Sequence, residues 1–215
     1  MIFKDRVDAG EKLFTQLRKS SLVNPPAGGQ KEIVIVSLLR GGAILGDVLS
    51  RKLKAPHLPL AVVKISAPEN EELAIGALVF DVVYLEKRII DSLFLTKQEI
   101  REQISTAKEK FSNYCKTFLL KKKTYDMLSG KTVILVDDGV ATGATMKAAA
   151  LFVKGEGAKV VIVAVPVAFD ELDLKGIDKV LILHKDPHLS SVSQFYAEFP
   201  QIEDAEVKKL LKKRS

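Results

Sequence analysis

The chain has 215 residues and a formal net charge of +6 at pH 7, with 47% hydrophobic and 28% charged residues. This length supports one good hydrophobic core, and the composition is that of an ordinary soluble globular protein. No apolar run approaches the roughly 18–20 residues of a membrane span, and Lys4, Asp5 and Arg6 place charges where a signal peptide needs apolar residues. We therefore expect a cytoplasmic protein that contacts no membrane.

Much of the positive charge lies in two runs, residues 121–123 and 208–214. A basic surface can bind nucleic acid or attract a polyanionic small substrate. No aromatic residues interleave with the C-terminal run, as a platform for bases would require. We interpret both runs as solvated surface and do not expect nucleic acid as a partner.

Apolar periodicity and turn residues predict the elements in chain order. The first half should contain a helix over 5–20, a loop over 24–29, a strand over 33–39, a helix over 43–54, a strand over 58–65, an acidic loop over 66–76, and a strand or hairpin over 77–85. The second half should contain a helix over 96–118, a strand over 133–136, a helix ending near 154, strands over 159–166 and 179–184, and a helix over 203–212.

Strands that alternate with helices indicate an α/β fold with a central parallel sheet flanked by helices. We see no internal repeat and expect a single domain over residues 1–215, with its core at about 30–185.

The most informative segment runs from Val133 to Thr145. Its four apolar residues suit a strand buried on both faces, and the adjacent Asp137 and Asp138 follow where that strand ends. Ligands gather at the carboxyl ends of parallel strands, and the N–H groups of a helix start favour phosphate. Carboxylates beside a phosphate cradle suggest a sugar phosphate as ligand. The alternative is that the acidic pair only caps the helix. Adjacent carboxylates repel each other, however, so a simple turn without a ligand or cation does not favour them.

This segment resembles the phosphoribosyl pyrophosphate (PRPP) signature of the type I phosphoribosyltransferases. Ser37 to Gly42 is similar to the pyrophosphate loop of that family, and Lys64 to Ala77 begins where such enzymes carry a mobile loop. With the run from Ser193 to Pro200, the resemblance is to a little-characterised branch of the family and covers about residues 5–210. It implies a type I phosphoribosyltransferase fold with a small hood built from the chain ends.

The resemblance also implies site roles. Asp137 and Asp138 would hold the ribose hydroxyls and Mg²⁺, directly or through metal-bound water. Arg40, with Lys64 as a second cation, would assist departure of the diphosphate. The PRPP-binding residues would be Arg40, Gly41, Gly42, Asp137, Asp138, Gly139, Val140, Ala141, Thr142, Gly143, Ala144 and Thr145. The Arg40–Gly41 peptide should be able to adopt the cis form.

The acceptor is expected near Phe195 and Tyr196, because a flat base needs an aromatic or aliphatic face. Phe195 and Phe199 are four residues apart, however, and can equally form the core face of a helix.

The expected reaction transfers a phosphoribosyl group from PRPP to an unidentified nitrogenous base, with release of pyrophosphate and with Mg²⁺ as cofactor. Two alternatives stay open: a PRPP- or nucleotide-sensing regulator that binds nucleic acid, and PRPP hydrolysis without an acceptor, since a fold does not fix a function. The sequence leaves a homodimer open.

Overall fold

The computed structural model describes residues 2–20, 22–23 and 32–212. The loop predicted at 24–29 lies outside the described residues. The elements follow in the order α1 (Arg6–Lys19), β1 (Ile33–Leu38), α2 (Gly42–Leu53), β2 (His57–Leu60), β3 (Val63–Ala67), β4 (Asn70–Val79), β5 (Val82–Leu85), α3 (Lys87–Ser92), α4 (Lys97–Phe118), η1 (Lys122–Leu128), β6 (Thr132–Val136), α5 (Ala144–Gly155), β7 (Val160–Phe169), β8 (Lys179–Asp186), η2 (Val192–Phe195) and α6 (Asp204–Lys212).

The predicted central sheet is confirmed as five parallel strands in the order β2-β1-β6-β7-β8. Every residue of β6 is buried, and β1 is buried from Val34 onward. Such continuous burial is the expected environment of parallel strands with helices on both faces. The Val-, Ile- and Leu-rich runs of the sequence therefore form the buried central strands β1 and β6.

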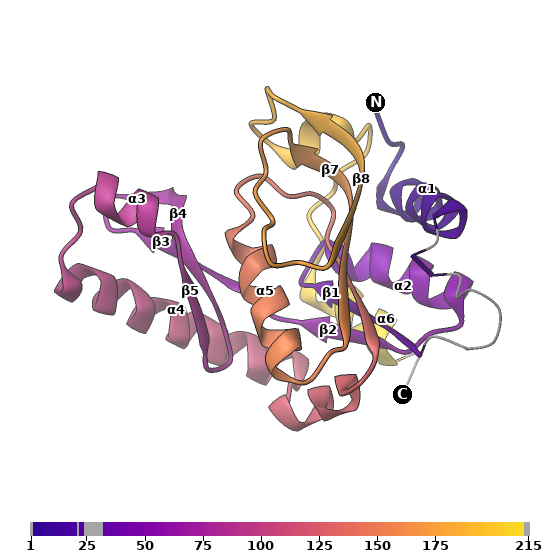
Figure 1. Cartoon of the computed structure of the whole chain (residues 1–215), viewed down its shortest axis with the longest axis horizontal. Coiled ribbons are helices and arrows are strands. Elements are labelled where there is room, and N and C mark those ends of the chain that lie inside the picture. The colour runs from indigo at the N-terminus through magenta and orange to yellow at the C-terminus, as the bar shows by residue number, and fades with distance from the viewer. Residues whose placement is uncertain (1, 21, 24–31, 213–215) are drawn as a thin grey trace.

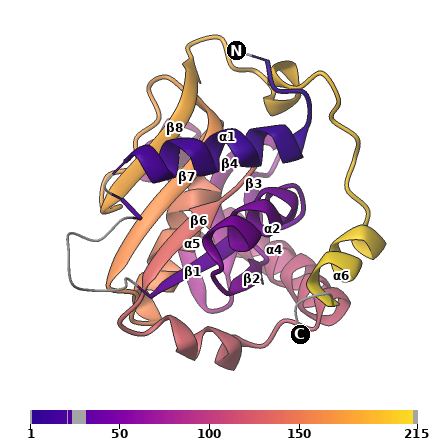
Figure 2. The same ribbon diagram turned by 90° about the vertical axis from the view of Figure 1, so that its right-hand side faces the viewer.

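The two faces of this sheet are covered by different helices. Ile35, Ile134 and Ile162 pack with α1 and α2 on one face, which Figure 2 shows in front of the strands. On the other face, Val133 and Val163 pack against α5. Strand residues one apart point to opposite faces, so the same apolar runs supply both layers of the core.

Helix α5 lies between the central sheet and a second, three-stranded antiparallel sheet, β3-β4-β5 (Figure 1). Its alanines at 148, 149 and 150 are buried, and Ala77 and Val79 of β4 belong to the same apolar cluster. A helix that is apolar almost all round is buried on both sides. The alanine-rich stretch after the signature thus packs one sheet against the other.

The second sheet corrects the sequence analysis over residues 58–76. The predicted single strand is two strands in different sheets, and the predicted acidic loop is mostly the β3–β4 hairpin. Burial alternates along β3, as expected for a strand with one covered face, whereas β4 begins with exposed residues before its apolar half. The acidic residues mark the solvent-exposed end of a hairpin. The hairpin predicted over 77–85 is confirmed as β4–β5.

The predicted long helix is confirmed as α4, which begins with a capping box between Thr96 and Glu99. The apolar stripe of α4, which includes Ala107 and Phe111, packs against β3 and β4. The short α3 before it was not predicted. Together, β3 to α4 form a unit that projects to one side of the central sheet (Figure 1).

The basic run at 121–123 was interpreted as solvated surface. All three lysines are exposed, which confirms this interpretation, and the side chain of Lys122 also lies 2.9 Å from the Asp81 carboxylate and 3.5 Å from that of Glu156. The η1 turn, which begins at Lys122, buries Tyr125 and Leu128. This basic residue therefore links the β4–β5 turn to the end of α5.

The N-terminal segment pairs with the segment that follows η2. The Phe3 N–H donates to the Phe195 carbonyl at 2.7 Å, and the Phe3 carbonyl accepts from the Ala197 N–H at 2.8 Å. Helix α6 packs its Val207 beside Ala43 of α2 and Phe118 of α4. That these ends act as a hood, and that the chain is one domain, stay predictions.

Close packing of α2 on the strands generates a first prediction. A Cβ added to Gly46 would lie 2.7 Å from the Ser37 Cβ and 2.4 Å from the His57 Nε2. Gly46→Ala should therefore lower the free energy of unfolding by about 1–3 kcal/mol, the usual cost of overpacking. Urea unfolding measures this, with Gly155→Ala as the matched control because a Cβ there meets nothing within 4 Å. Equal stabilities of the two variants would contradict the packing.

Candidate functional site

The candidate site lies where the connections of the central sheet diverge. From β1 the chain passes through α2 to β2 on one side, and from the adjacent β6 it passes through α5 to β7 on the other. In open α/β sheets this switch point leaves a crevice at the carboxyl ends of the strands. The loops that leave β1 and β6 are the two predicted from the sequence.

These two loops touch through glycine backbone. A Cβ added to Gly41 would lie 1.8 Å from the Asp138 Oδ2, and one added to Gly42 would lie 2.7 Å from the Val136 carbonyl oxygen. No other residue type fits at these distances, so both glycines are required by the close approach. The predicted grouping of Gly41 and Gly42 with the acidic pair therefore agrees with the geometry.

Asp137 joins the two loops. Its Oδ1 accepts the Asp138 N–H at 2.9 Å, and a Cβ added to Gly42 would lie 3.1 Å from the same oxygen. Burial, followed by the neighbouring Asp138 charge, raises the pKa of Asp137 well above its ordinary value. The Asp137 carboxylate is therefore held by the Asp138 amide at a buried position that disfavours its charged form.

Asp138 forms an ion pair that the sequence analysis missed. Its Oδ2 accepts the Arg6 Nε–H at 2.8 Å, and the two side chains are 16% and 8% exposed. Burial raises the pKa of Asp138 even though the Arg6 hydrogen bond opposes the shift. Arg6 is 132 positions away in sequence, so no local pattern could have indicated this contact.

The signature loop after the acidic pair leads into the start of α5. Gly143 has φ of +83° and immediately precedes the helix, a conformation that glycine adopts without strain. Val140 is anchored to β7 because its N–H donates to the Val167 carbonyl at 2.9 Å, while Ala141 and Thr142 are exposed. Ala141, Thr142, Gly143 and Thr145 therefore border open space next to the start of α5, where an anion site would lie.

A cleft of about 1,020 Å³ opens along this loop. One wall is the signature loop from Gly139 to Thr145, and the facing wall comes from the projecting unit, including Lys64 and Glu86. Lys147 of α5 crosses between them, with its Nζ 2.9 Å from the Glu86 carboxylate and 3.1 Å from the Tyr84 hydroxyl. The predicted Lys64 is therefore brought to the cleft, whereas Lys147 and Glu86 were not foreseen.

Arg40 lies differently from the expectation. Its side chain is engaged by the C-terminal segment, with Nη1 donating to the Ile202 carbonyl at 3.2 Å and Nε 3.5 Å from the Asp204 carboxylate. Arg40 does not line the cleft, and neither do Gly41, Gly42, Asp137 and Asp138, which lie next to it at the start of the signature loop. The cis peptide bond of this loop is Leu39–Arg40, one residue earlier than the predicted Arg40–Gly41 bond.

Phe195 and Tyr196 are 9% and 7% exposed and belong to the core cluster under α1. Tyr196 packs against Phe3 and Phe199, and its hydroxyl donates to the Asp138 carbonyl at 2.7 Å. These are the contacts of core residues, and Tyr196 also fixes the backbone of the signature. The acceptor role of both residues stays a prediction.

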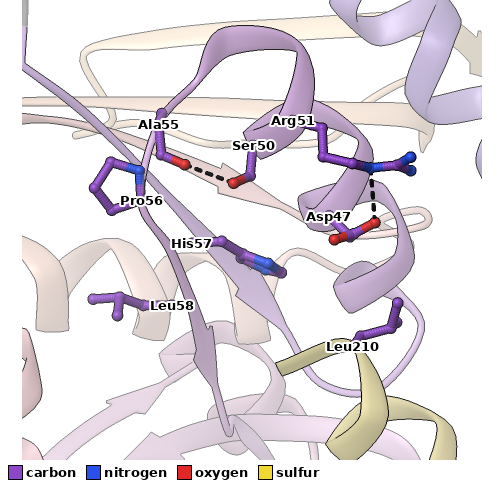
Figure 3. Close-up of a pocket in the computed structure, with 8 residues that line it drawn as sticks. All are labelled: Asp47, Ser50, Arg51, Ala55, Pro56, His57, Leu58 and Leu210. Atoms are coloured by element: carbon purple, nitrogen blue, oxygen red, sulfur yellow. Dashed lines mark hydrogen bonds and ion pairs between the residues drawn. The ribbon is translucent and has the colours of Figure 1, made fainter. Parts of the chain in front are cut away.

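A second pocket, of about 860 Å³, lies at the opposite, amino end of β2 (Figure 3). His57 points into it, and the Asp47–Arg51 ion pair borders it at 3.1 Å. The His57 ring is hydrogen-bonded to the Ser37 hydroxyl at 2.7 Å. None of the signature residues line this pocket, so we place the candidate site at the cleft beside the signature loop.

Comparison with known proteins decides the family. A sequence profile of the phosphoribosyl transferase domain matches residues 4–186. The chain belongs to this family. Two proteins from strains of Mycobacterium tuberculosis, named putative phosphoribosyl transferases, are 30% identical over 214 residues, which is 96% of this chain and 45% of each relative. The chain thus spans about half the length of these curated relatives.

Solved structures agree with the fold of a phosphoribosyl transferase domain. The protein TT1426 from Thermus thermophilus is 29% identical, with both chains covered in full and a TM-score of 0.73. AQ2163 from Aquifex aeolicus is 14% identical over 84% of this chain and 74% of its own, with a TM-score of 0.51, which shows the fold alone. The expected type I phosphoribosyltransferase fold is confirmed. In the described residues, no helix is both long and apolar enough to cross a membrane.

The acidic pair of this phosphoribosyl transferase domain generates a second prediction. Because the folded-state pKa of Asp137 is raised, its protonated form favours folding below the unfolded pKa near 3.8, and this contribution is lost as the pH rises through the folded pKa. Asp137→Asn keeps the Oδ1 acceptor and removes the charge. The variant should gain stability over the wild type as the pH is raised from about 4 to 8.

Urea unfolding of the ligand-free protein at several pH values measures this difference. Asp126→Asn, at an exposed position in η1, is the control and should follow the wild type. A constant difference between Asp137→Asn and the wild type across the pH range would contradict the raised pKa.

Proposed function

We propose that the chain transfers a phosphoribosyl group from PRPP to a nitrogenous base, with release of pyrophosphate and dependence on Mg²⁺. The observation that carries the proposal is the contact of Gly41 and Gly42 with Asp137 and Asp138 beside the helix start at Ala144. This contact gathers donors for two anionic groups and acceptors for hydroxyls within one site, which is the chemistry that a sugar carrying a phosphate and a diphosphate requires.

Each part of PRPP has a place in the proposal. The amides of residues 141–145 would bind the 5′-phosphate at the start of α5. The acidic pair would accept hydrogen bonds from the ribose hydroxyls. The Gly41 and Gly42 segment, with Lys64 across the cleft and Arg40 once it leaves Asp204, would bind the diphosphate.

The residues fit magnesium that arrives with the substrate. In the described residues, no group of three or more His, Cys, Asp or Glu side chains could hold a metal ion by itself. Mg²⁺ prefers one or two carboxylates together with substrate phosphates and waters, which matches an adjacent pair of Asp side chains. When bound, the ion would neutralise charge on the departing diphosphate.

Catalysis in this proposal depends on holding the ribose and stabilising the leaving group. Departure of the diphosphate leaves an oxocarbenium-like centre at the anomeric carbon, and the base attacks from the opposite side with inversion. Positive groups placed around the diphosphate in the substrate complex would stabilise its developing charge. The projecting unit forms the facing wall of the cleft, and ordering of its hairpin end would exclude water from the reactive centre.

The acceptor would lie in the cleft next to the anomeric carbon. Phe169, Leu189 and Val192 line the part of the cleft opposite the projecting unit and offer an apolar face for a flat ring. Phe195 and Tyr196, predicted as acceptor residues, follow Val192 in the chain, and their burial favours a supporting role behind this wall.

A third prediction tests PRPP recognition. Asp137→Asn and Asp138→Asn should each weaken Mg²⁺–PRPP binding by about 1–3 kcal/mol, the scale of a lost charge-assisted hydrogen bond. Titration calorimetry measures the affinity, with Asp126→Asn as the remote control. Unchanged affinity in both variants would remove the acidic pair from the site.

The reaction itself is tested by following pyrophosphate release from Mg²⁺–PRPP with a panel of purine and pyrimidine bases. Release that depends on one base supports transfer, whereas base-independent release supports hydrolysis. PRPP binding without release, together with a salt-dependent shift of DNA or RNA, would favour the regulatory alternative.

A fourth prediction concerns the outer end of the β3–β4 hairpin, which the sequence analysis expected to be mobile. Glu69, Asn70 and Glu71 are exposed and have few apolar anchors, while Lys64 lies further along β3 at the cleft. Hydrogen exchange of residues 69–73 should slow on addition of Mg²⁺–PRPP, while exchange of the remote η1 segment stays constant. Identical exchange of residues 69–73 with and without ligand would exclude closure of this end.

A further inference from the structure

Arg6 makes contacts that the proposed reaction does not yet use. It is the first residue of α1, and its side chain is 8% exposed. Its Nε donates to the Asp138 Oδ2, its Nη1 donates to the Pro200 carbonyl at 2.8 Å, and its guanidinium carbon lies 3.7 Å from the centre of the Phe199 ring. Arg6 therefore connects the N-terminal helix, the C-terminal segment and the signature.

Folding stability alone is a weak reason for this arrangement. A partly buried ion pair loses hydration on both partners, and apolar residues of similar size often stabilise a fold equally well. The guanidinium also lies at the start of a helix, where the helix dipole favours an anion over a cation. Because Arg6 adds little to folding stability yet contacts the Asp138 carboxylate, we look for its role in the orientation of that carboxylate.

The contacts around Asp138 fix its orientation. The Arg6 Nε lies against Oδ2 on one side, and the Gly41 backbone is so close that a Cβ there would meet the same oxygen at 1.8 Å. The Tyr196 hydroxyl holds the main-chain carbonyl of the same residue. The Arg6 Nε–H engages one of the two carboxylate oxygens, and a carboxylate can accept further hydrogen bonds, such as one from a substrate hydroxyl.

We propose that Arg6 is a positioning residue, which holds Asp138 in the orientation that the ribose of PRPP requires, so that the packing of α1 against the C-terminal segment tunes substrate affinity. This inference rests on the proposed function, because it takes Asp138 to be a PRPP ligand. Arg6 acts only through Asp138 and is not itself placed on the substrate. Pro200 and Phe199 hold the guanidinium in the direction that the Asp138 contact requires.

A double-mutant cycle on Mg²⁺–PRPP affinity tests the proposal. Arg6→Lys keeps a positive charge, but one ammonium cannot reproduce two donors in a fixed fork. It should weaken PRPP binding about 10- to 100-fold, the range for residues that orient a ligand-binding side chain. In the Asp138→Asn background the same substitution should have little further effect, because the charged carboxylate that Arg6 positions has been replaced by an amide.

The matched control is Arg51→Lys, which changes an arginine on α2 that is ion-paired with Asp47 and 61% exposed. It should leave PRPP affinity unchanged. Unfolding curves of each variant separate stability from affinity: a purely structural role would lower the stability of Arg6→Lys while the folded fraction binds PRPP like the wild type, and that result would overturn the proposal.

Phe199→Leu provides a second route if Arg6→Lys folds poorly. It removes the ring beneath the guanidinium and leaves both charges in place, so PRPP affinity should fall in the Asp138 protein and not in the Asp138→Asn protein. Equal losses in both backgrounds would overturn the positioning role. A wild-type protein that binds no Mg²⁺–PRPP would overturn the proposed function and this inference with it, whereas loss in Asp138→Asn without loss in Arg6→Lys or Phe199→Leu overturns this inference alone.

Discussion

The close approach of two loops at the carboxyl ends of β1 and β6 is the constraint on which the rest of the site depends. Gly41 lies against the Asp138 carboxylate and Gly42 against the Val136 carbonyl, so neither position has space for a side chain. Because β1 and β6 are paired in register from Ile33 to Ser37, the two loops emerge at the same level. The sheet determines where the loops meet, and the glycines determine how closely.

The position of the second sheet, β3-β4-β5, next to the site follows from the position of helix α5. Helix α5 starts at the signature loop, so any element that packs on its outer face lies beside the site. Small side chains at Ala148 and Ala149 let β4 approach this helix, and Lys147 ties it to Glu86 at the end of the hairpin unit. The wall of the cleft is therefore positioned by the helix that begins at the signature loop.

Sequence patterns predicted what is local. The stripe and capping residues of α4, the buried strands and the signature loop all depend on residues within a few positions of one another. The split at residues 61–62 into two sheets was missed because an apolar run looks the same whether it continues or changes sheet. Arg6 was missed for a different reason: its partner Asp138 and its support Phe199 are brought to it only by the complete fold.

The acidic pair shows how a site and a stable fold make opposing demands. Two adjacent carboxylates in a partly buried place raise each other's cost, and burial raises the pKa of both. The fold offsets part of this cost with the Asp138 amide on Asp137 and the Arg6 guanidinium on Asp138. Each of these two hydrogen-bond donors also orients the carboxylate that it contacts. The same contacts therefore stabilise the two negative charges and fix the directions of the two side chains. The two carboxylates are therefore already ordered before a cation or a hydroxyl-rich ligand binds. This preorganisation would lower the entropic cost of binding.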